Sequence, residues 1–373
     1  LLANIHHHLA ALPTPPTIIA VDCPSGIDCD TGQAAPQCLP ADLTVCMAAV
    51  KTGMLRFPAF ELLGDLRLVD IGLPADLAPW QAIRRRVVAA DMLRGVLPPR
   101  PALAHKGTFG TALVVAGSLS YTGAALLAGR AAFRVGAGLV TLAVAQPLHA
   151  ALAGHFPEAT WLLLPHEAGF ISAQAHTVVR SHLQHAAALL LGPGFGLAST
   201  TADFLSTLLE SQVTLPTVID ADGLKLLARI PHWPQKLPTA SVLTPHPGEM
   251  AVLTGLPVAE IQADRLEIAE KYAADWGHVV VLKGANTVIA APDGSAAVIP
   301  VASPALARAG SGDVLAGLVA GLCAQGVPAY PAAYTAAWLH AQSGLAAARR
   351  LGPASVLAGD LITELPGVLL SMD

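Results

Sequence analysis

Short apolar runs that alternate with longer alanine-rich stretches fill the sequence from about residue 100 onwards. Seven of these runs have the length of buried strands, and they lie at 111–115, 139–144, 187–191, 217–219, 241–243, 278–282 and 287–290. Strands that alternate with helices form a parallel sheet with helices on both faces, because each connection between parallel strands needs a crossover. The pattern predicts a large α/β domain over this part of the sequence.

A shorter apolar pattern precedes this domain. Its strand-like runs lie at 17–21, 42–47 and 65–71, and the proline cluster at 98–101 separates them from the longer alternation. Proline clusters are typical of segments between domains. At 373 residues the sequence is also longer than one ordinary domain. We therefore expect a partial α/β domain in front of the large one.

The segment 314–348 contains no Lys, Arg, Asp or Glu, which raises the question of a membrane span. Pro328 and Pro331 interrupt it before it reaches the ~20 apolar residues that a spanning helix needs. We expect two buried helices here, no membrane partner and a cytoplasmic location.

The composition excludes several classes of protein. Charged residues make up 13% of the sequence and apolar residues 53%, with a net charge of −5. The basic triplet at 84–86 is too small for a nucleic-acid-binding surface. The five cysteines contain no CxxC pair, so we expect reduced thiols rather than a zinc or redox motif.

The segment 309–317 (AGSGDVLAG) joins the three small residues at 310–312 and a carboxylate to an apolar run that is typical of a buried helix. Gly310 and Gly312 allow successive N–H groups to converge at the helix N-terminus, where partial positive charge favours an anion. Asp313 would accept the proton of an attacking hydroxyl group, and the helix N-terminus is expected to lower its pKa. The segment predicts an anion site beside a weak base, although a plain Gly/Ser turn also fits it when it is taken alone.

Glycine-rich or polar segments follow four of the predicted strands: GPGFG at 192–196, DADG at 220–223, TPHPGE at 244–249 and KGANT at 283–287. Each alone is also compatible with an ordinary turn. Because ligands collect at the carboxyl ends of parallel strands, their shared position favours a binding site. We expect KGANT to bind a nucleotide phosphate or ribose, and Glu249 or Asp220 to hold Mg²⁺ directly or through water.

In this order the segments resemble the ribokinase-like NAD(P)H-hydrate dehydratase family. The six motifs that carry the resemblance are HKGTFG at 105–110, GPGFG, DADG, TPHPGE, LKGA at 282–285 and AGSGDV at 309–314. The resemblance implies a three-layer α/β domain with a mostly parallel central sheet. It also implies a reaction, in which ADP phosphorylates the ring hydroxyl of the S form of hydrated NADH or NADPH. Loss of phosphate then restores NAD(P)H.

The resemblance also assigns residues to the site. Asp313 is expected to be the catalytic residue, and the residues expected to bind the hydrated dinucleotide are Ala124, Gly194, His246 and Asp313. The residues expected to bind the nucleotide are Lys283, Gly284, Ala285, Asn286, Thr287, Gly310, Ser311 and Gly312. ADP or ATP would serve as phosphoryl donor, with Mg²⁺ near Glu249. Relatives assemble into dimers and tetramers, so a homo-oligomer is expected.

The region before the proline cluster resembles the C-terminal part of the Rossmann-like NAD(P)H-hydrate epimerase domain. The matching segments are VDCPSGID at 21–28, ADLTV at 41–45 and the stretch 64–74. The expected domains are therefore the epimerase part at 1–80, a linker and entry segment at 81–102, and the dehydratase at 103–373.

Two residues match the functional positions of the epimerase family. Asp22 corresponds to a substrate position and Ser25 to a potassium position, but no glycine/asparagine-rich loop precedes Asp22. We therefore expect this chain to lack competent epimerase activity. Because Leu1 stands where Met would be expected, the natural N-terminus is expected to lie further upstream.

Two other functions remain open from the residues alone. One is a kinase of the same architecture that acts on a hydroxymethylpyrimidine or hydroxyethylthiazole, and TPHPGE together with the epimerase-like region argues against it. The other is a nucleotide-binding regulatory protein, which would need neither Asp313 nor the glycines beside it.

Overall fold

The computed structural model describes residues 1–74, 76–239 and 241–372. Contacts between residues divide the chain into two units, Leu1–Ile83 and Arg84–Asp373. Each unit has its own central sheet.

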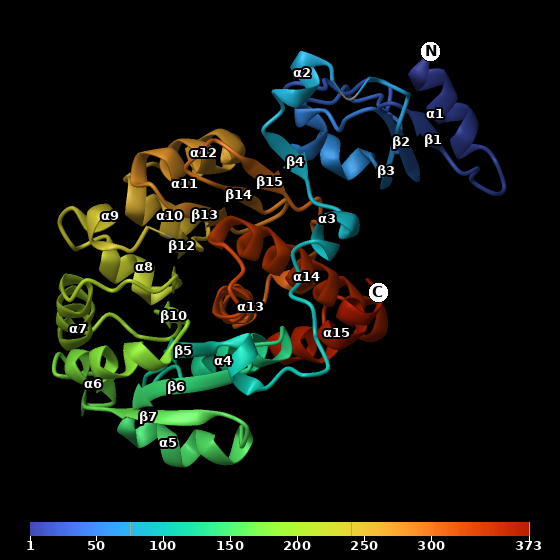
Figure 1. Ribbon diagram of the computed structural model, residues 1–373. Coiled ribbons are helices and arrows are strands. Elements are labelled where there is room, and N and C mark those ends of the chain that lie inside the picture. The colour runs from blue at the N-terminus through green and yellow to red at the C-terminus, as the bar shows by residue number, and fades with distance from the viewer. Residues whose placement is uncertain (75, 240, 373) are drawn as a thin grey trace. The chain divides into compact units, whose positions relative to one another are not determined.

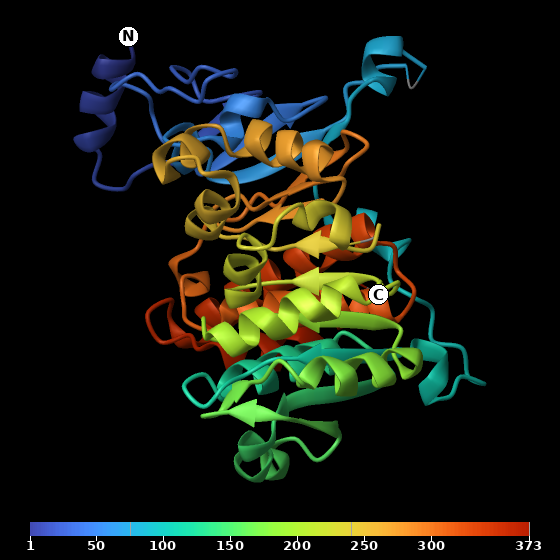
Figure 2. The same cartoon turned by 90° about the vertical axis from the view of Figure 1, so that its left-hand side faces the viewer.

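Within residues 84–239 and 241–372, ten strands form one sheet in the order β4-β15-β14-β13-β12-β11-β10-β5-β6-β7. Their bounds are β4 Arg85–Val87, β5 Thr111–Val115, β6 Leu139–Ala145, β7 Thr160–Leu164, β10 Ala188–Leu191, β11 Thr217–Ile219, β12 Val242–Leu243, β13 Val279–Leu282, β14 Val288–Ala290 and β15 Ala296–Val298. Neighbouring strands are parallel except for the pairs β13–β14 and β14–β15. The green and yellow arrows in Figure 2 accordingly point the same way. The prediction of a mostly parallel sheet is confirmed.

Helices cover both faces of this sheet (Figure 1). One face carries α4 Gly123–Arg134, α13 Ser311–Ala324, α14 Ala329–Leu351 and α15 Ala358–Leu370. The other carries α6 Ala175–His182, α7 Ser199–Glu210, α8 Asp222–Leu227, α10 Pro247–Thr254, α11 Val258–Ala263 and α12 Arg265–Trp276. Further elements of this unit are α3 Ala90–Arg94, α5 Gln146–Leu152, α9 Trp233–Lys236, β8 His166–Glu167 and β9 Phe170–Ile171. Val114, Leu190 and Val281 of the central strands are fully buried, as expected for parallel strands between two helical layers.

Helices α4 and α13 approach each other closely because small residues line their contact. A Cβ atom added to Gly317 would lie 2.1 Å from the backbone oxygen of Ala128, and one added to Gly321 would lie 2.6 Å from that of Ala132. Only glycine leaves room for the backbones to meet at these distances. The two buried helices predicted within 314–348 are confirmed as α13 and α14.

The division between the units precedes the proline cluster at 98–101. Strand β4 pairs with β15, and Leu93 of α3 is buried in the core of the second unit. Much of the segment expected to be a linker, 81–102, therefore contributes a strand and a helix to this unit. The sequence pattern missed β4, which reads Arg-Arg-Val, and β15, which has only three residues.

The first unit contains a parallel sheet of three strands within residues 1–74 and 76–83, in the order β1-β2-β3. The bounds are β1 Ile19–Val21, β2 Leu43–Met47 and β3 Asp65–Val69, with helices α1 Leu2–Ala10 and α2 Ala78–Gln81. Cys46, Met54 and Leu63 form its small core. All three predicted strands are present.

Two expectations from composition can be compared with the structure. In the part of the chain that the structure describes, no helix has both the length and the hydropathy to cross a membrane. The five cysteines, all within the described ranges, are free thiols.

Candidate active site

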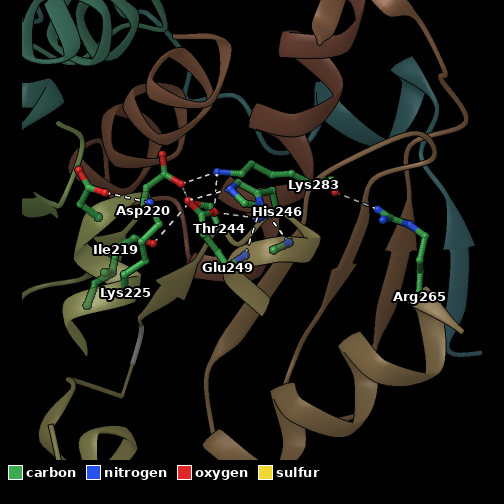
Figure 3. Close-up of polar contacts among 10 residues, drawn as sticks. Ile219, Asp220, Lys225, Thr244, His246, Glu249, Arg265 and Lys283 are labelled. Carbon is green, nitrogen blue, oxygen red and sulfur yellow. Dashed lines mark hydrogen bonds and ion pairs between the residues drawn. The ribbon is translucent and has the colours of Figure 1, made fainter. Parts of the chain in front are cut away.

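Three polar residues meet at the carboxyl ends of the parallel strands. Asp220 follows β11, Thr244 follows β12 and Lys283 follows β13 (Figure 3). The Lys283 Nζ lies 2.6 Å from Asp220 Oδ1, and Thr244 Oγ1 donates a hydrogen bond to the same oxygen at 2.7 Å. Three of the four strand-end segments predicted to form one site, DADG, TPHPGE and KGANT, are therefore brought together here.

Lys283 also reaches a second carboxylate. Its Nζ lies 3.5 Å from Glu249 Oε2, and the Asp220 and Glu249 side chains are only 1% and 4% exposed. Burial alone would lower the pKa of Lys283, but the charges of Asp220 and Glu249 outweigh burial and raise it. The ammonium therefore stays charged between two carboxylates.

His246 and Glu249 hold each other at the start of α10. His246 Nδ1 accepts hydrogen bonds from the N–H groups of Gly248 and Glu249 at 3.0 and 3.2 Å, and Glu249 Oε2 accepts one from the His246 N–H at 2.8 Å. This reciprocal cap satisfies N–H groups that the helix leaves without partners. Because Nδ1 accepts, the ring proton lies on Nε2, and burial lowers the pKa of the ring. A neutral imidazole, with 52% of its side chain exposed, borders the site.

The N-terminus of α13 lies against the lysine and its carboxylates. Gly310 caps the helix with φ of +85°, and Ser311 Oγ donates to the Leu306 carbonyl at 2.8 Å. A Cβ atom on Gly312 would lie 3.3 Å from Lys283 Nζ and 3.7 Å from Asp220 Oδ2. The N–H groups of this turn and the Lys283 ammonium therefore present positive charge to the same region.

The expectation that the pKa of Asp313 is lowered is wrong. Burial raises the pKa of Asp313 to about 7, Asp220 adds to this rise, and Lys283 opposes it. A rise from an ordinary value near 4 corresponds to roughly 4 kcal/mol. A helix terminus contributes only about 0.3–1 kcal/mol, so burial and the neighbouring carboxylate determine the direction.

Two residues expected to bind the hydrated dinucleotide lie next to each other. A Cβ atom on Gly194 would lie 2.8 Å from the Cβ atom of Ala124, at the start of α4, and Gly194 has φ of +65°. Asp222 holds the neighbouring backbone, since its Oδ2 accepts a hydrogen bond from the Gly196 N–H at 2.9 Å. The GPGFG loop is therefore fixed by a residue of the DADG segment.

The segment expected to bind the nucleotide forms an exposed turn after β13. Gly284 has φ of +143°, Asn286 is buried, and Thr287 Oγ1 donates to the Gly284 carbonyl at 2.8 Å. Gly284 and Ala285 are exposed. The turn therefore offers backbone groups to solvent.

Arg265, at the start of α12, supports this turn from behind. Its Nη2 donates to the carbonyls of Leu282 and Lys283 at 2.8 and 3.2 Å (Figure 3). A Cβ atom on Gly284 would lie 3.0 Å from the guanidinium nitrogens. Sequence analysis missed this residue because a single Arg at a helix start carries no motif.

Asp22 and Ser25 belong to the first unit. Asp22 follows β1 with φ of 70°, accepts a hydrogen bond from the Met47 N–H at 3.0 Å and forms an ion pair with Lys51. The hydrogen bond from Lys51 is the main reason that the pKa of Asp22 is lowered. Ser25 is exposed. Lys51 is a partner that sequence analysis did not identify.

The carboxylates of the second unit suit a hard cation. Among the described residues, no three His, Cys, Asp or Glu side chains are grouped as metal ligands. Asp220 Oδ2 is buried and has no hydrogen-bond partner among the described residues. Mg²⁺ prefers such oxygen ligands and commonly completes its shell with phosphate oxygens and water. Asp220 therefore fits a Mg²⁺ ion that arrives with a phosphate group.

Curated proteins of known function are similar to almost the whole chain. The bifunctional NAD(P)H-hydrate repair enzyme Nnr of Moorella thermoacetica is 44% identical over 95% of this chain, and that of Salinibacter ruber is 39% identical over 95%. The chain covers 67% and 66% of the lengths of these two proteins, so it spans about two thirds of each.

Solved structures are similar to the chain as well. The ADP/ATP-dependent NAD(P)H-hydrate dehydratase of Bacillus subtilis, co-crystallised with ATP and Mg²⁺, matches with a TM-score of 0.65 and 32% identity, covering 78% of this chain and 100% of that one. A ribokinase-like superfamily protein of Enterococcus faecalis matches with a TM-score of 0.67 and 26% identity, covering 77% and 96%. These matches confirm the ribokinase-like fold.

Family profiles match both units. The profile of the YjeF-related protein N-terminus matches residues 2–53. The profile of NAD(P)H-hydrate dehydratase matches residues 112–367, which include Asp220, Lys283 and Asp313. The chain belongs to the NAD(P)H-hydrate dehydratase family.

Proposed function

We propose that the second unit catalyses nucleotide-dependent dehydration of the S form of hydrated NADH or NADPH. In the first step, the ring hydroxyl attacks the terminal phosphorus of ADP, and AMP leaves. In the second, the phosphate group leaves with its bonding electrons, a ring proton is lost, and the ring double bond returns. The products are NAD(P)H, AMP and phosphate.

The observation that carries this proposal is the position of Asp313 at the N-terminus of α13, beside Lys283 and Asp220. A carboxyl group with a pKa of about 7 accepts a proton more strongly than an ordinary carboxylate, and it is still substantially ionised at neutral pH. Asp313 would take the proton of the ring hydroxyl as the new phosphorus–oxygen bond forms.

Positive charge around Asp313 supports transfer of a phosphoryl group. The N–H groups of Gly310 to Gly312 would bind its oxygens, and Lys283 would neutralise part of their charge. Asp220, with Glu249 nearby, would hold Mg²⁺, which neutralises charge on phosphate oxygens when it is bound. The ADP/ATP-dependent relative from B. subtilis was crystallised with ATP and Mg²⁺.

The two substrates would occupy different sides of this cluster. The exposed turn 283–287, supported by Arg265, would bind the nucleotide. The contact between Gly194 and Ala124, with His246 at the border, would bind the hydrated dinucleotide. At Gly194 the absence of a side chain allows close approach to the backbone.

Recovery of NADH tests the proposal. The chain is incubated with purified S-hydrate of NADH, Mg²⁺ and either ADP or ATP, and the NADH absorbance band and AMP or ADP release are followed. We expect recovery only with nucleotide, and a large loss in Asp313→Asn. Comparison of ADP with ATP identifies the preferred donor. A stable phosphate ester of a hydroxymethylpyrimidine or hydroxyethylthiazole, without turnover of the hydrate, would instead assign the chain to the small-molecule kinases.

For the first unit we propose a fragment of an epimerase site around Asp22 and Lys51, with potassium near Ser25. No glycine/asparagine-rich loop lies ahead of Asp22 in this sequence, so we expect no interconversion of R and S hydrates by the chain. Measurable interconversion would contradict this expectation. A homo-oligomeric state and a cytoplasmic location remain predictions.

A further inference from the structure

A histidine outside every sequence motif contacts the catalytic turn. His340 lies on α14, which packs against α13. Its Nε2 lies 2.9 Å from the backbone oxygen of Ser311, the first residue of α13. A carbonyl oxygen only accepts hydrogen bonds, so Nε2 carries the proton and donates it to Ser311.

The peptide bond that accepts this hydrogen bond also supplies an N–H group to the proposed anion site. In a planar trans peptide the carbonyl of Ser311 and the N–H of Gly312 point in opposite directions. Near the start of a helix the N–H groups lack partners within the helix and point away from its body. Gly312 is also the glycine that lies against Lys283 and Asp220. The bond from His340 therefore acts on the carbonyl end of the peptide that joins Ser311 to Gly312, the glycine next to the charged cluster.

Besides holding the peptide in place, this hydrogen bond changes the charge distribution of the peptide group. A carbonyl that accepts a hydrogen bond polarises its own peptide group, which makes the N–H of that peptide a better donor. Burial lowers the pKa of His340 to about 4, despite the opposing effect of the Ser311 hydrogen bond, and Lys283 lowers it further. The ring is therefore neutral near pH 7, with its single proton kept on Nε2.

We propose that His340 is a positioning residue for the reaction, which orients and polarises the Ser311–Gly312 peptide so that the Gly312 N–H binds the transferred phosphoryl group. The inference rests on the proposed function and adds a residue to it. Because the contact matters most as charge develops on the phosphoryl oxygens, its loss should reduce kcat more than it raises KM.

Two substitutions that introduce side chains of similar size distinguish the hydrogen bond donated by His340 from the packing of its side chain. His340→Met removes the donor, whereas His340→Gln places an amide N–H near the former Nε2. We expect His340→Met to reduce kcat about tenfold, as for loss of one hydrogen bond, with KM for both substrates within about twofold. His340→Gln should recover most of the rate. Both variants should have similar melting temperatures.

His278 provides a matched control. Its Nε2 also lies 2.9 Å from a backbone oxygen, that of Pro234, and burial also lowers its pKa. His278 precedes β13 and so lies at the amino end of this strand, whereas Lys283 and the proposed active site lie at its carboxyl end. We expect His278→Met to lower the melting temperature and to leave kcat within about twofold of wild type.

The amide resonance of Gly312, in protein labelled with ¹⁵N-glycine, tests the contact without catalysis. It should shift in His340→Met and return toward its wild-type position in His340→Gln. The inference is overturned if the resonance is unchanged in His340→Met, or if an active wild type loses kcat equally in the Met, Gln and His278→Met variants. An inactive wild type with the expected shifts would contradict the proposed function and leave the positioning of Gly312 by His340 supported.

Discussion

The Lys283 ammonium contacts the Asp220 carboxylate at 2.6 Å in a place where Asp220 is almost fully buried. Removing one partner of a buried ion pair costs about 3–5 kcal/mol, because the remaining charge has no counter-ion. We expect Lys283→Met to lower the free energy of unfolding by about 3 kcal/mol. Adding Asp220→Asn should recover part of that loss, and urea denaturation of both variants measures this.

A surface pair serves as the control for this prediction. Lys271 and Asp275 lie 2.7 Å apart on α12, with side chains 60% and 53% exposed. Water and salt screen such a pair, so Lys271→Met should lower the free energy of unfolding much less than Lys283→Met does. Equal losses for Lys271→Met and Lys283→Met would contradict the role of burial.

The raised pKa of Asp313 predicts how the rate depends on pH. As pH falls through about 7, Asp313 becomes protonated and can no longer accept the hydroxyl proton. We expect kcat/KM to fall about tenfold per pH unit below that point. Asp220→Asn removes a negative charge that raises the pKa of Asp313. The fall in kcat/KM should therefore begin at a lower pH in this variant, as measured on its residual activity. A rate that is constant between about pH 5 and 8 would exclude Asp313 as the base.

Replacing two glycines of α13 should affect different properties, the rate in one case and the stability in the other. Gly312→Ala places a Cβ atom 3.3 Å from Lys283 Nζ, so the flexible lysine side chain has to move to make room. We expect about a tenfold loss of kcat and little change in melting temperature. Gly317→Ala places a Cβ atom 2.1 Å from a backbone oxygen, which should cost at least about 2 kcal/mol of stability.

Gly367 of α15 is the control for these glycine variants. A Cβ atom at this position meets no atom within 4 Å. Because alanine favours a helix over glycine, Gly367→Ala should be neutral or slightly stabilising. Thermal unfolding and steady-state kinetics of the three variants distinguish the outcomes, and a stability loss in Gly312→Ala as large as that in Gly317→Ala would argue against a functional role.

Arg265 should control nucleotide binding through the turn that it supports. Arg265→Met removes the hydrogen bonds to the Leu282 and Lys283 carbonyls. We expect KM for ADP or ATP to rise about tenfold, KM for the hydrate to stay within about threefold, and Arg265→Lys to recover part of the affinity. Arg85→Met, which removes an arginine bound to Glu270 on the same helix, is the control. A parallel rise in both KM values would contradict the assignment.

The sequence predicted the sheet well where the apolar runs are continuous. The run 188–191 is fully buried, and its short length and the Gly-Pro-Gly that follows it are typical of a buried parallel strand. Strand β4 was missed because two of its three residues are exposed arginines that gain their place by pairing with β15. Such edge strands depend on a partner far away in the sequence.

Within the candidate site, the sequence predicted which residues lie close together only where those residues belong to motifs. Asp220 and Lys283 were expected at one edge because both follow parallel strands, and the structure places them in contact. The pKa of Asp313 was predicted in the wrong direction, since burial and neighbouring charge depend on packing that the motif does not describe. Arg265 and His340 contact the site through hydrogen bonds to backbone carbonyls, and such bonds leave no pattern in one sequence.

The close contact between α4 and α13 has a consequence for tolerance to mutation. Gly317 is about one helical turn from Asp313, so its contact with the backbone of α4 helps to position the end of α13 that carries Asp313. A methyl group added at this point would tilt the helix and move the carboxylate without touching it. In a library of random variants, inactive but folded proteins should therefore be enriched in changes at the small residues of this contact, such as Ala128 and Gly321.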